Sequence, residues 1–296
     1  MTDDRRFRAI ASLRGLAVGD AFGSCFFVAA NRPALDTRDL PPEPWWWTDD
    51  TEMACSVFTI LDVLGQVDED ALVASFAAHH DFDRGYGPGV NRMLRLIRQE
   101  NADWRQLAAE AFGGRGSWGN GAAMRVAPLG AWFADDPGQA AAQAAASARV
   151  THAHPEGVAG AVAVAVAAAL AASQPALHGA QFLDEVAGHV PPGTVRDKIG
   201  YARDLLHLDD PRSAAAPLGN GREISAPDTV PFCLWVTAKH PSDFTSALWA
   251  TASAGGDIDT TCAIVGGITA ARDGGDSVPT EWLRRCEPLP DWAGVT

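Results

Sequence analysis

Apolar residues recur along most of the chain at a spacing of three to four residues, which is typical of amphipathic helices. Alternating apolar and polar runs, which would indicate strands, are scarce, and the Asn-Gly pairs lie in glycine-rich segments. The predicted helices are Phe7–Val18, Met53–Leu64, Glu69–His79, Val90–Gln99, Trp104–Phe112, Gln139–Val150, Val158–Ala172, Phe182–His189, Val195–His207, Thr229–Thr237, Phe244–Ala254 and Thr261–Arg272. The pattern therefore predicts an all-α fold.

Two of these helices, Gln139–Arg149 and Val158–Ala172, are rich in alanine. Alanine is the best helix former and is small, so such helices can pack with close axes. No repeat with a period of 20–50 residues is present, and Asp209–Pro231, rich in Pro and Gly, is the best loop candidate. We expect one compact domain over residues 1–296.

Composition narrows the possible partners. Apolar residues make up 47% and charged residues 20%, as in a soluble globular chain, and the net charge is −14. That charge argues against non-specific binding to nucleic acid or anionic lipid, and Val158–Ala172 is too short to span a membrane. Met1–Arg8 is charged, unlike a signal peptide, and the five cysteines form no CxxC pair. We expect a cytoplasmic protein with reduced, mostly buried thiols.

Two short polar segments stand directly before apolar helices. Thr48–Glu52 follows three tryptophans, and Gly255–Thr261 carries a D-x-D pair after two glycines. Each segment alone is compatible with a helix N-cap. At a loop-to-helix junction the two aspartates can converge, and the glycines permit a tight entry.

The two segments together suggest a metal centre. Several ionised carboxylates brought together without a cation would repel one another strongly. A set of oxygen ligands suits Mg²⁺, Mn²⁺ or Ca²⁺ and disfavours zinc. If the two segments meet, a two-metal site with a bridging carboxylate is the expected product.

Six motifs occur in order along the chain, and together they resemble the ADP-ribosylglycohydrolase family over about residues 8 to 272. They are Gly15–Gly23 (GLAVGDAFG), Trp47–Thr51 (WTDDT), Asp83–Gly87 (DRGYG), Gly119–Pro128 (GNGAAMRVAP), Thr151–Ala153 (THA) and Gly255–Thr260 (GGDIDT).

The resemblance implies roughly orthogonal helices, two Mg²⁺ or Mn²⁺ ions, and cleavage of the bond at C1″ of an ADP-ribosyl group. ADP-ribose or an ADP-ribosylated substrate is the implied partner. The implied metal ligands are Thr48, Asp49, Asp50, Asp257, Asp259 and Thr260, with Asp259 bridging. Asp49, Asp50 and Asp259 would be the catalytic carboxylates, while Asp20, which stands alone, is expected to play a supporting role.

The resemblance also implies substrate-binding residues. Gly116–Gly121 precedes a helix expected near Ala122, and it is either an ordinary turn or an anion cradle for the diphosphate. Tyr86 either packs on adenine or ribose or lies half-buried in a surface turn. Arg125 either reaches phosphate or pairs with a carboxylate. The implied contacts are Gly85, Tyr86, Gly87, Ser117, Gly119, Asn120, Gly121 and His152.

One position departs from the family pattern. Many catalytic members carry a glutamate four residues after the last glycine of the first motif, where this chain has Phe27. Asp36 or Glu43 could substitute, or Phe26, Phe27 and the tryptophan run 45–47 could form an apolar lid. For at least Trp47, packing in an aromatic core is the favoured explanation. We predict an ADP-ribosyl hydrolase; the alternatives are a non-catalytic ADP-ribose binder and a metal phosphohydrolase that releases AMP. The sequence does not identify the leaving group.

Overall fold

Helices account for all the regular secondary structure that the computed structural model describes, which covers residues 2–295, so the prediction of an all-α fold is confirmed. The α-helices are α1 (Thr2–Ser24), α2 (Ala34–Thr37), α3 (Asp49–Leu64), α4 (Glu69–His79), α5 (Pro88–Glu100), α6 (Trp104–Gly114), α7 (Ala127–Trp132), α8 (Pro137–Arg149), α9 (Pro155–Ser173), α10 (Gly179–His189), α11 (Thr194–Asp204), α12 (Pro211–Leu218), α13 (Ala226–Lys239), α14 (Phe244–Ser253), α15 (Ile258–Arg272) and α16 (Thr280–Arg285). Short 3-10 turns are η1 (Cys25–Phe27), η2 (Ala29–Asn31), η3 (Phe82–Arg84), η4 (Asn120–Ala122) and η5 (Asp291–Ala293).

Several helices begin earlier than the apolar period predicts, because proline occupies their first turn. Proline has no N–H to offer, and the first turn of a helix needs none. Helices α5, α8 and α9 begin at Pro88, Pro137 and Pro155. The prediction of a continuous loop over Asp209–Pro231 is wrong, since α12 forms inside it and α13 begins at Ala226.

The prediction of a helix that begins near Ala122 is also wrong. The chain forms only the 3-10 turn η4 there, and α7 begins at Ala127, with Pro128 in its first turn. The glycine-rich loop therefore enters a single turn rather than the start of an α-helix.

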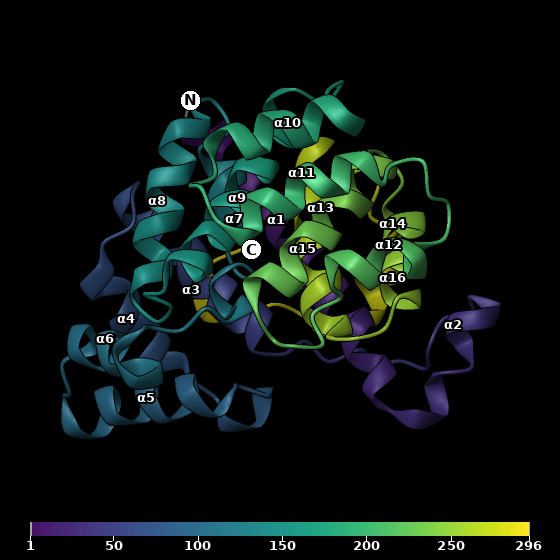
Figure 1. The fold of residues 1–296 in the computed structure, drawn as a ribbon. Helices are drawn as coiled ribbons and strands as arrows, with labels where there is room; N and C mark the ends of the chain where they lie inside the picture. The colour runs from purple at the N-terminus through teal and green to yellow at the C-terminus, as the bar shows by residue number, and fades with distance from the viewer. Residues whose placement is uncertain (1, 296) are drawn as a thin grey trace.

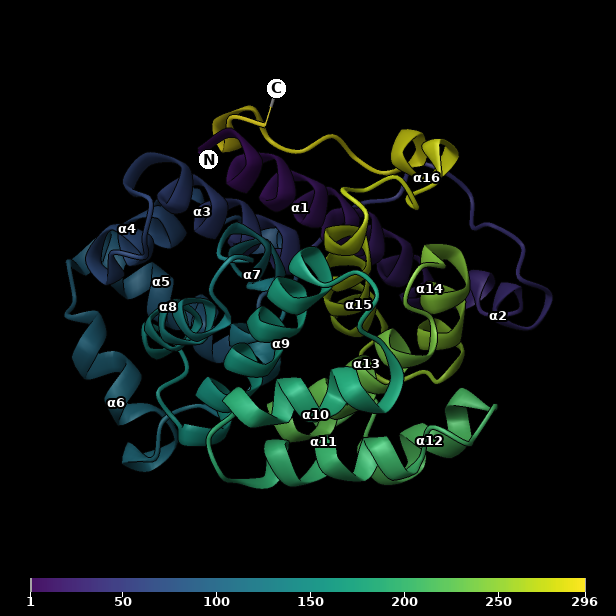
Figure 2. The ribbon, with the colours of Figure 1, turned by 90° about the horizontal axis from the view of Figure 1, so that it is seen from above.

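Helices α1 and α15 form the most extensive helix pair and lie near the centre of the bundle (Figures 1 and 2). Gly15, Gly19 and Gly23 recur every four residues on α1 and face α15. A side chain at Gly19 would lie 2.1 Å from the carbonyl oxygen of Cys262. These glycines let the two backbones approach closely, and α1 therefore ends beside the start of α15.

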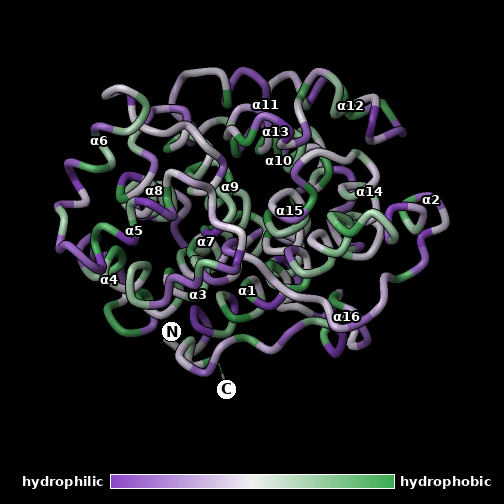
Figure 3. The backbone as a smooth tube through the Cα atoms, turned by 90° about the horizontal axis from the view of Figure 1, so that it is seen from below, coloured by the Kyte–Doolittle hydropathy of each residue, from purple (hydrophilic) through white to green (hydrophobic). Residues whose placement is uncertain are grey.

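Alanine-rich α9 packs against α8, α7 and α15, and nearly all of its side chains are buried. Figure 3 shows green along much of the inner helices, and purple mainly in segments at the edge of the molecule. Two segments, Asp4–Phe27 and Pro155–Ser173, are long and apolar enough to cross a membrane. The second corrects the expectation that this helix is too short, but 78% of each qualifying window is buried inside the fold, as in core helices of soluble proteins.

Candidate metal centre

Three carboxylates from three helices meet at one place. Asp20 lies near the end of α1, Asp50 in the first turn of α3 and Asp259 in the first turn of α15, and one oxygen from each lies within 4.8 Å of the others. The sequence predicts that the starts of α3 and α15 meet, and they do: the Thr260 hydroxyl approaches Asp50 Oδ2 at 3.5 Å.

Asp20 holds the start of α3 in place. Its two oxygens accept hydrogen bonds from the backbone N–H and the hydroxyl of Thr48, at 2.8 and 2.9 Å, and from those of Thr51, at 3.1 and 2.6 Å. Asp20 has the supporting role expected from the sequence, and it also belongs to the carboxylate group.

The start of α15 is held by loops. Gly255 and Gly256 have φ values of 70° and 79°, which confirms the tight entry that the glycines predict. Asp257 is the N-cap residue and stands outside the helix, as the D-x-D argument requires. Its Oδ2 accepts a hydrogen bond of 2.7 Å from Asn120 Nδ2.

Crowding and burial change the protonation of the carboxylates. Burial, followed by the hydrogen bonds of the threonines acting in the opposite direction, leaves the pKa of Asp20 raised to about 6. Burial and then the negative charge of Asp20 raise the pKa of Asp49 to about 8. The pKa values of Asp50 and Asp259 lie well above their usual range for the same reasons, burial first and neighbouring carboxylates second.

The donor set fits a divalent cation. Asp50 is 1% exposed, and its Oδ1 is buried without a hydrogen-bond partner. A buried carboxylate oxygen with no partner is costly, and a cation would remove both that cost and the mutual repulsion of the three carboxylates. All the candidate ligand atoms are oxygens, which is the ligand type of Mg²⁺ and Mn²⁺.

The predicted substrate-binding residues fall on two loops, 81–87 and 117–121, except His152, which lies in the connection between α8 and α9. Residues 117–121 cover His152, since a side chain at Gly119 or Gly121 would lie about 3 Å from the His152 ring. Burial lowers the pKa of His152 to about 3, so this histidine is neutral, and its Nδ1 is 2.7 Å from the Thr151 hydroxyl. Ser117 Oγ accepts a bond from the Gly119 N–H. The roles in diphosphate binding stay predictions.

The other loop, residues 81–87, lies against α3. A side chain at Gly85 would lie 3.9 Å from Asp49 Oδ1, and Gly87 is the N-cap residue of α5. Tyr86 is 7% exposed, and its hydroxyl donates a 2.6 Å hydrogen bond to Glu52. The sequence analysis did not single out Glu52. Its position three residues after Asp49 places both on the same face of the helix, which was the available signal that Glu52 lies near the site.

The predicted pairing of Arg125 with a carboxylate is wrong. The guanidinium is fully buried, donates to the Ser147 carbonyl at 2.6 Å and lies over the Phe76 ring at 4.6 Å. Burial lowers its pKa to about 9, and its contact with a phosphate stays a prediction.

The structure shows where Phe27, the residue that departs from the family pattern, lies. Phe27 is 52% exposed at the end of η1, whereas Phe26 is buried. Trp45 and Trp47 belong to the core and Trp46 is 58% exposed. Asp36 and Glu43, the candidate substitutes, form ion pairs with Arg212 and Arg284, respectively.

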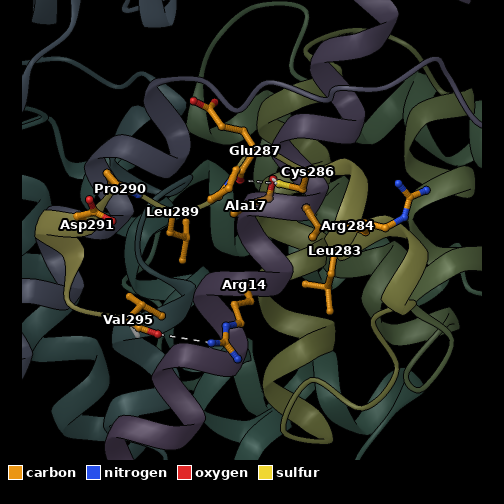
Figure 4. Close-up of a pocket in the computed structure, with 12 residues that line it drawn as sticks. Arg14, Ala17, Leu283, Arg284, Cys286, Glu287, Leu289, Pro290, Asp291 and Val295 are labelled. Atoms are coloured by element: carbon orange, nitrogen blue, oxygen red, sulfur yellow. Dashed lines mark hydrogen bonds between the residues drawn. The ribbon is translucent and has the colours of Figure 1, made fainter.

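A cavity of about 520 Å³ lies elsewhere (Figure 4). It is formed by α1 residues such as Arg14 and Ala17, by the end of α16 and by the segment that follows it. None of the predicted ligands lines it. Glu287 lines this cavity and forms an ion pair with Arg84 of the loop 81–87.

Comparison with known proteins decides the family. A family profile described as ADP-ribosylglycohydrolase matches residues 1–294. This chain belongs to the ADP-ribosylglycohydrolase family.

Curated relatives agree with that assignment. The chain is 30% identical to human "ADP-ribosylhydrolase ARH3", with 95% of this chain and 90% of that protein covered. It is 27% identical to "ADP-ribosyl-[dinitrogen reductase] glycohydrolase" of Rhodospirillum rubrum, with the same coverage of 95% and 90%. A solved structure titled "ADP-ribosylglycohydrolase-related protein complex" shares the fold, with a TM-score of 0.61 at 23% identity over 99% of this chain and 96% of that one. The family and the names of the relatives indicate an ADP-ribosyl glycohydrolase.

Proposed function

We propose that this family member is a metal-dependent hydrolase that cleaves the glycosidic bond at C1″ of an ADP-ribosyl group, carried by a protein side chain or a small molecule. The observation that carries the proposal is the group formed by buried Asp20 and Asp50 and half-buried Asp259, with Asp50 Oδ1 lacking a partner. Family membership supplies the substrate class.

The proposed ligands are Thr48, Asp49 and Asp50 from α3 and Asp257, Asp259 and Thr260 from α15, with Asp20 added by the structure. They would hold two Mg²⁺ or Mn²⁺ ions. Bound cations supply Lewis acidity and positive charge next to the bond that is cleaved. The positive charge of these cations would allow a protein of net charge −14 to bind an anionic ligand.

The protein's own residues orient the ligand atoms. Asp20 fixes the first turn of α3 through Thr48 and Thr51, and Asn120 fixes Asp257. Because both helix starts are fixed before substrate binds, little reorganisation is required during the reaction. Asp49, which lies next to Gly85 of the substrate loop, is the proposed group for proton transfer.

Release of free ADP-ribose from ADP-ribosylated arginine, ADP-ribosylated serine and small-molecule conjugates tests the proposal. We expect release with Mg²⁺ or Mn²⁺ and none with chelator. Asp50→Asn and Asp259→Asn should lose metal binding by calorimetry together with activity. Unchanged activity in both variants, or in chelator, would overturn the proposal, and AMP as the product would show attack on the diphosphate.

The exposed Phe27 keeps a second candidate, a binder of ADP-ribose without hydrolysis. A phenyl ring cannot take or give a proton, so a mechanism that needs a glutamate at this place fails here. Metal-dependent binding of ADP-ribose by calorimetry, without release from any conjugate, would support this candidate instead.

A further inference from the structure

Glu52 is a buried carboxylate outside the group of three. It lies on α3 one turn after Asp49 and is 5% exposed. One oxygen, Oε2, accepts hydrogen bonds from the Tyr86 hydroxyl at 2.6 Å and from the Asp81 backbone N–H at 3.1 Å. The negative charge of Glu52 is unfavourable both because the side chain is buried and because Asp49 lies beside it. The two hydrogen bonds compensate this cost.

The donors come from the two ends of one loop. Between Asp81 and Tyr86 the chain forms only the short turn η3, and Gly85 takes a left-handed conformation with φ of 93°. A segment with so little regular structure has few bonds of its own, so its shape depends on what holds it.

A second anchor fixes the middle of the loop. The Arg84 guanidinium lies 3.4 Å from the centre of the Trp47 ring and donates to the Trp47 carbonyl at 2.9 Å. It also forms two hydrogen bonds with Glu287, at 2.7 and 2.9 Å. Trp47 and Glu52 flank the turn Thr48–Asp50, so both anchors join the loop to the segment that carries the proposed ligands.

We infer that Glu52 is a positioning residue, which accepts hydrogen bonds from Asp81 and Tyr86 and thereby fixes the substrate loop 81–87 over the first turn of α3. The inference rests on the proposed function in taking this loop as the one that binds substrate. Glu52 acts as a hydrogen-bond acceptor in this role, and an amide oxygen can serve equally well.

Three variants separate an acceptor from a carboxylate that takes part in the chemistry. Glu52→Ala removes the acceptor, Glu52→Gln keeps it, and Tyr86→Phe removes the donor from the other side. Glu110→Ala, an exposed glutamate of α6, is the matched control. For each variant we would measure kcat and KM for release of ADP-ribose, Mn²⁺ affinity by calorimetry, and amide hydrogen exchange of residues 81–87.

We expect Tyr86→Phe to raise KM about tenfold, with kcat changed less than about threefold, as loss of one charge-assisted bond predicts. Glu52→Ala also loses the bond from the Asp81 N–H, so its KM should rise at least as much. The double variant should resemble Glu52→Ala, because the bond between Tyr86 and Glu52 is already absent there. Exchange in residues 81–87 should become faster in both single variants. Glu52→Gln and the control should behave as the unsubstituted protein, and Mn²⁺ affinity should hold in all.

Two results would overturn the inference: a rise of KM in Glu52→Gln as large as in Glu52→Ala, or unchanged KM and exchange in both Glu52→Ala and Tyr86→Phe. If Glu52→Ala does not fold, Tyr86→Phe and Glu52→Gln still decide the matter. If the unsubstituted protein releases no ADP-ribose, the proposed function fails, while the exchange of residues 81–87 still shows whether Glu52 holds the loop.

Discussion

The first turns of α3 and α15 face each other across the site, yet the rest of the protein holds them by different means. Asp20 holds α3 through four hydrogen bonds to Thr48 and Thr51. Helix α15 itself is held by close backbone contact, since Gly23 of α1 lies directly against Ile258 and Asp259, and the Asn120 hydrogen bond reaches only its N-cap residue, Asp257. Hydrogen bonds can be lost one at a time, whereas a close backbone contact leaves no room for even one added methyl group.

Gly23→Ala should have the largest effect, on the α15 side. The new Cβ would lie 2.5 Å from the Ile258 carbonyl oxygen and 2.6 Å from Asp259 Cα. We expect the free energy of unfolding to fall by about 3 kcal/mol, with loss of Mn²⁺ binding, because the start of α15 must move.

The control for that variant is Gly200→Ala in α11, where no other atom lies within 4 Å of the added methyl group. It should be neutral or stabilise by up to about 1 kcal/mol. Urea denaturation measures both. Equal stabilities for the two variants would contradict the assignment of the close contact.

Asp20→Asn should have a smaller effect, on the α3 side. The amide nitrogen would face the donors of Thr48 or Thr51, so part of the fastening is lost at a cost of about 2 kcal/mol. Mn²⁺ affinity should fall at least tenfold. Asp135→Asn, which weakens the surface ion pairs of Asp135 with Arg8 and Arg5, should change stability by less than about 1 kcal/mol. An Asp20→Asn protein with unchanged Mn²⁺ affinity would contradict the role of Asp20.

The smallest effect concerns pH and involves both helix starts. The pKa values of Asp20 and Asp49 are raised to about 6 and about 8, so in chelator the folded protein binds more protons than the unfolded chain above pH 4. Stability from these carboxylates is full below about pH 4 and is lost as pH rises through 6 and 8.

Asp50→Asn removes one of the crowded charges and isolates this effect. In chelator it should be more stable than the unsubstituted protein at pH 8 by roughly 1 kcal/mol, and the difference should vanish near pH 4. Excess Mn²⁺ should reverse the order at pH 8. Thermal unfolding across this pH range measures it, and a pH-independent difference would count against repulsion among the carboxylates.

Sequence patterns were sufficient for the fold class and for most of the helices, because long apolar periods record which face is buried. The same patterns were insufficient where the signal is short. Helix α7 covers only Ala127–Trp132, too few residues to show a period, and α12 contains Pro217.

For the site, the sequence predicted that the segments around Asp50 and Asp259 meet. It did not give Asp20 a place among the carboxylates, because that residue stands alone in its motif and only the packing of α1 on α15 brings it there. It also did not single out Glu52, whose part depends on a contact with a loop 34 residues away.

The pairing of α1 with α15 has a consequence for the order of events during synthesis. Ser12 of α1 bonds to Gly267 of α15, 255 residues later. At the usual rate of translation, roughly ten to fifty seconds separate the two on the ribosome. During that interval the glycine-lined face of α1 has no permanent partner in the nascent chain. The group of Asp20, Asp50 and Asp259 cannot assemble over the same interval, because Asp259 belongs to α15.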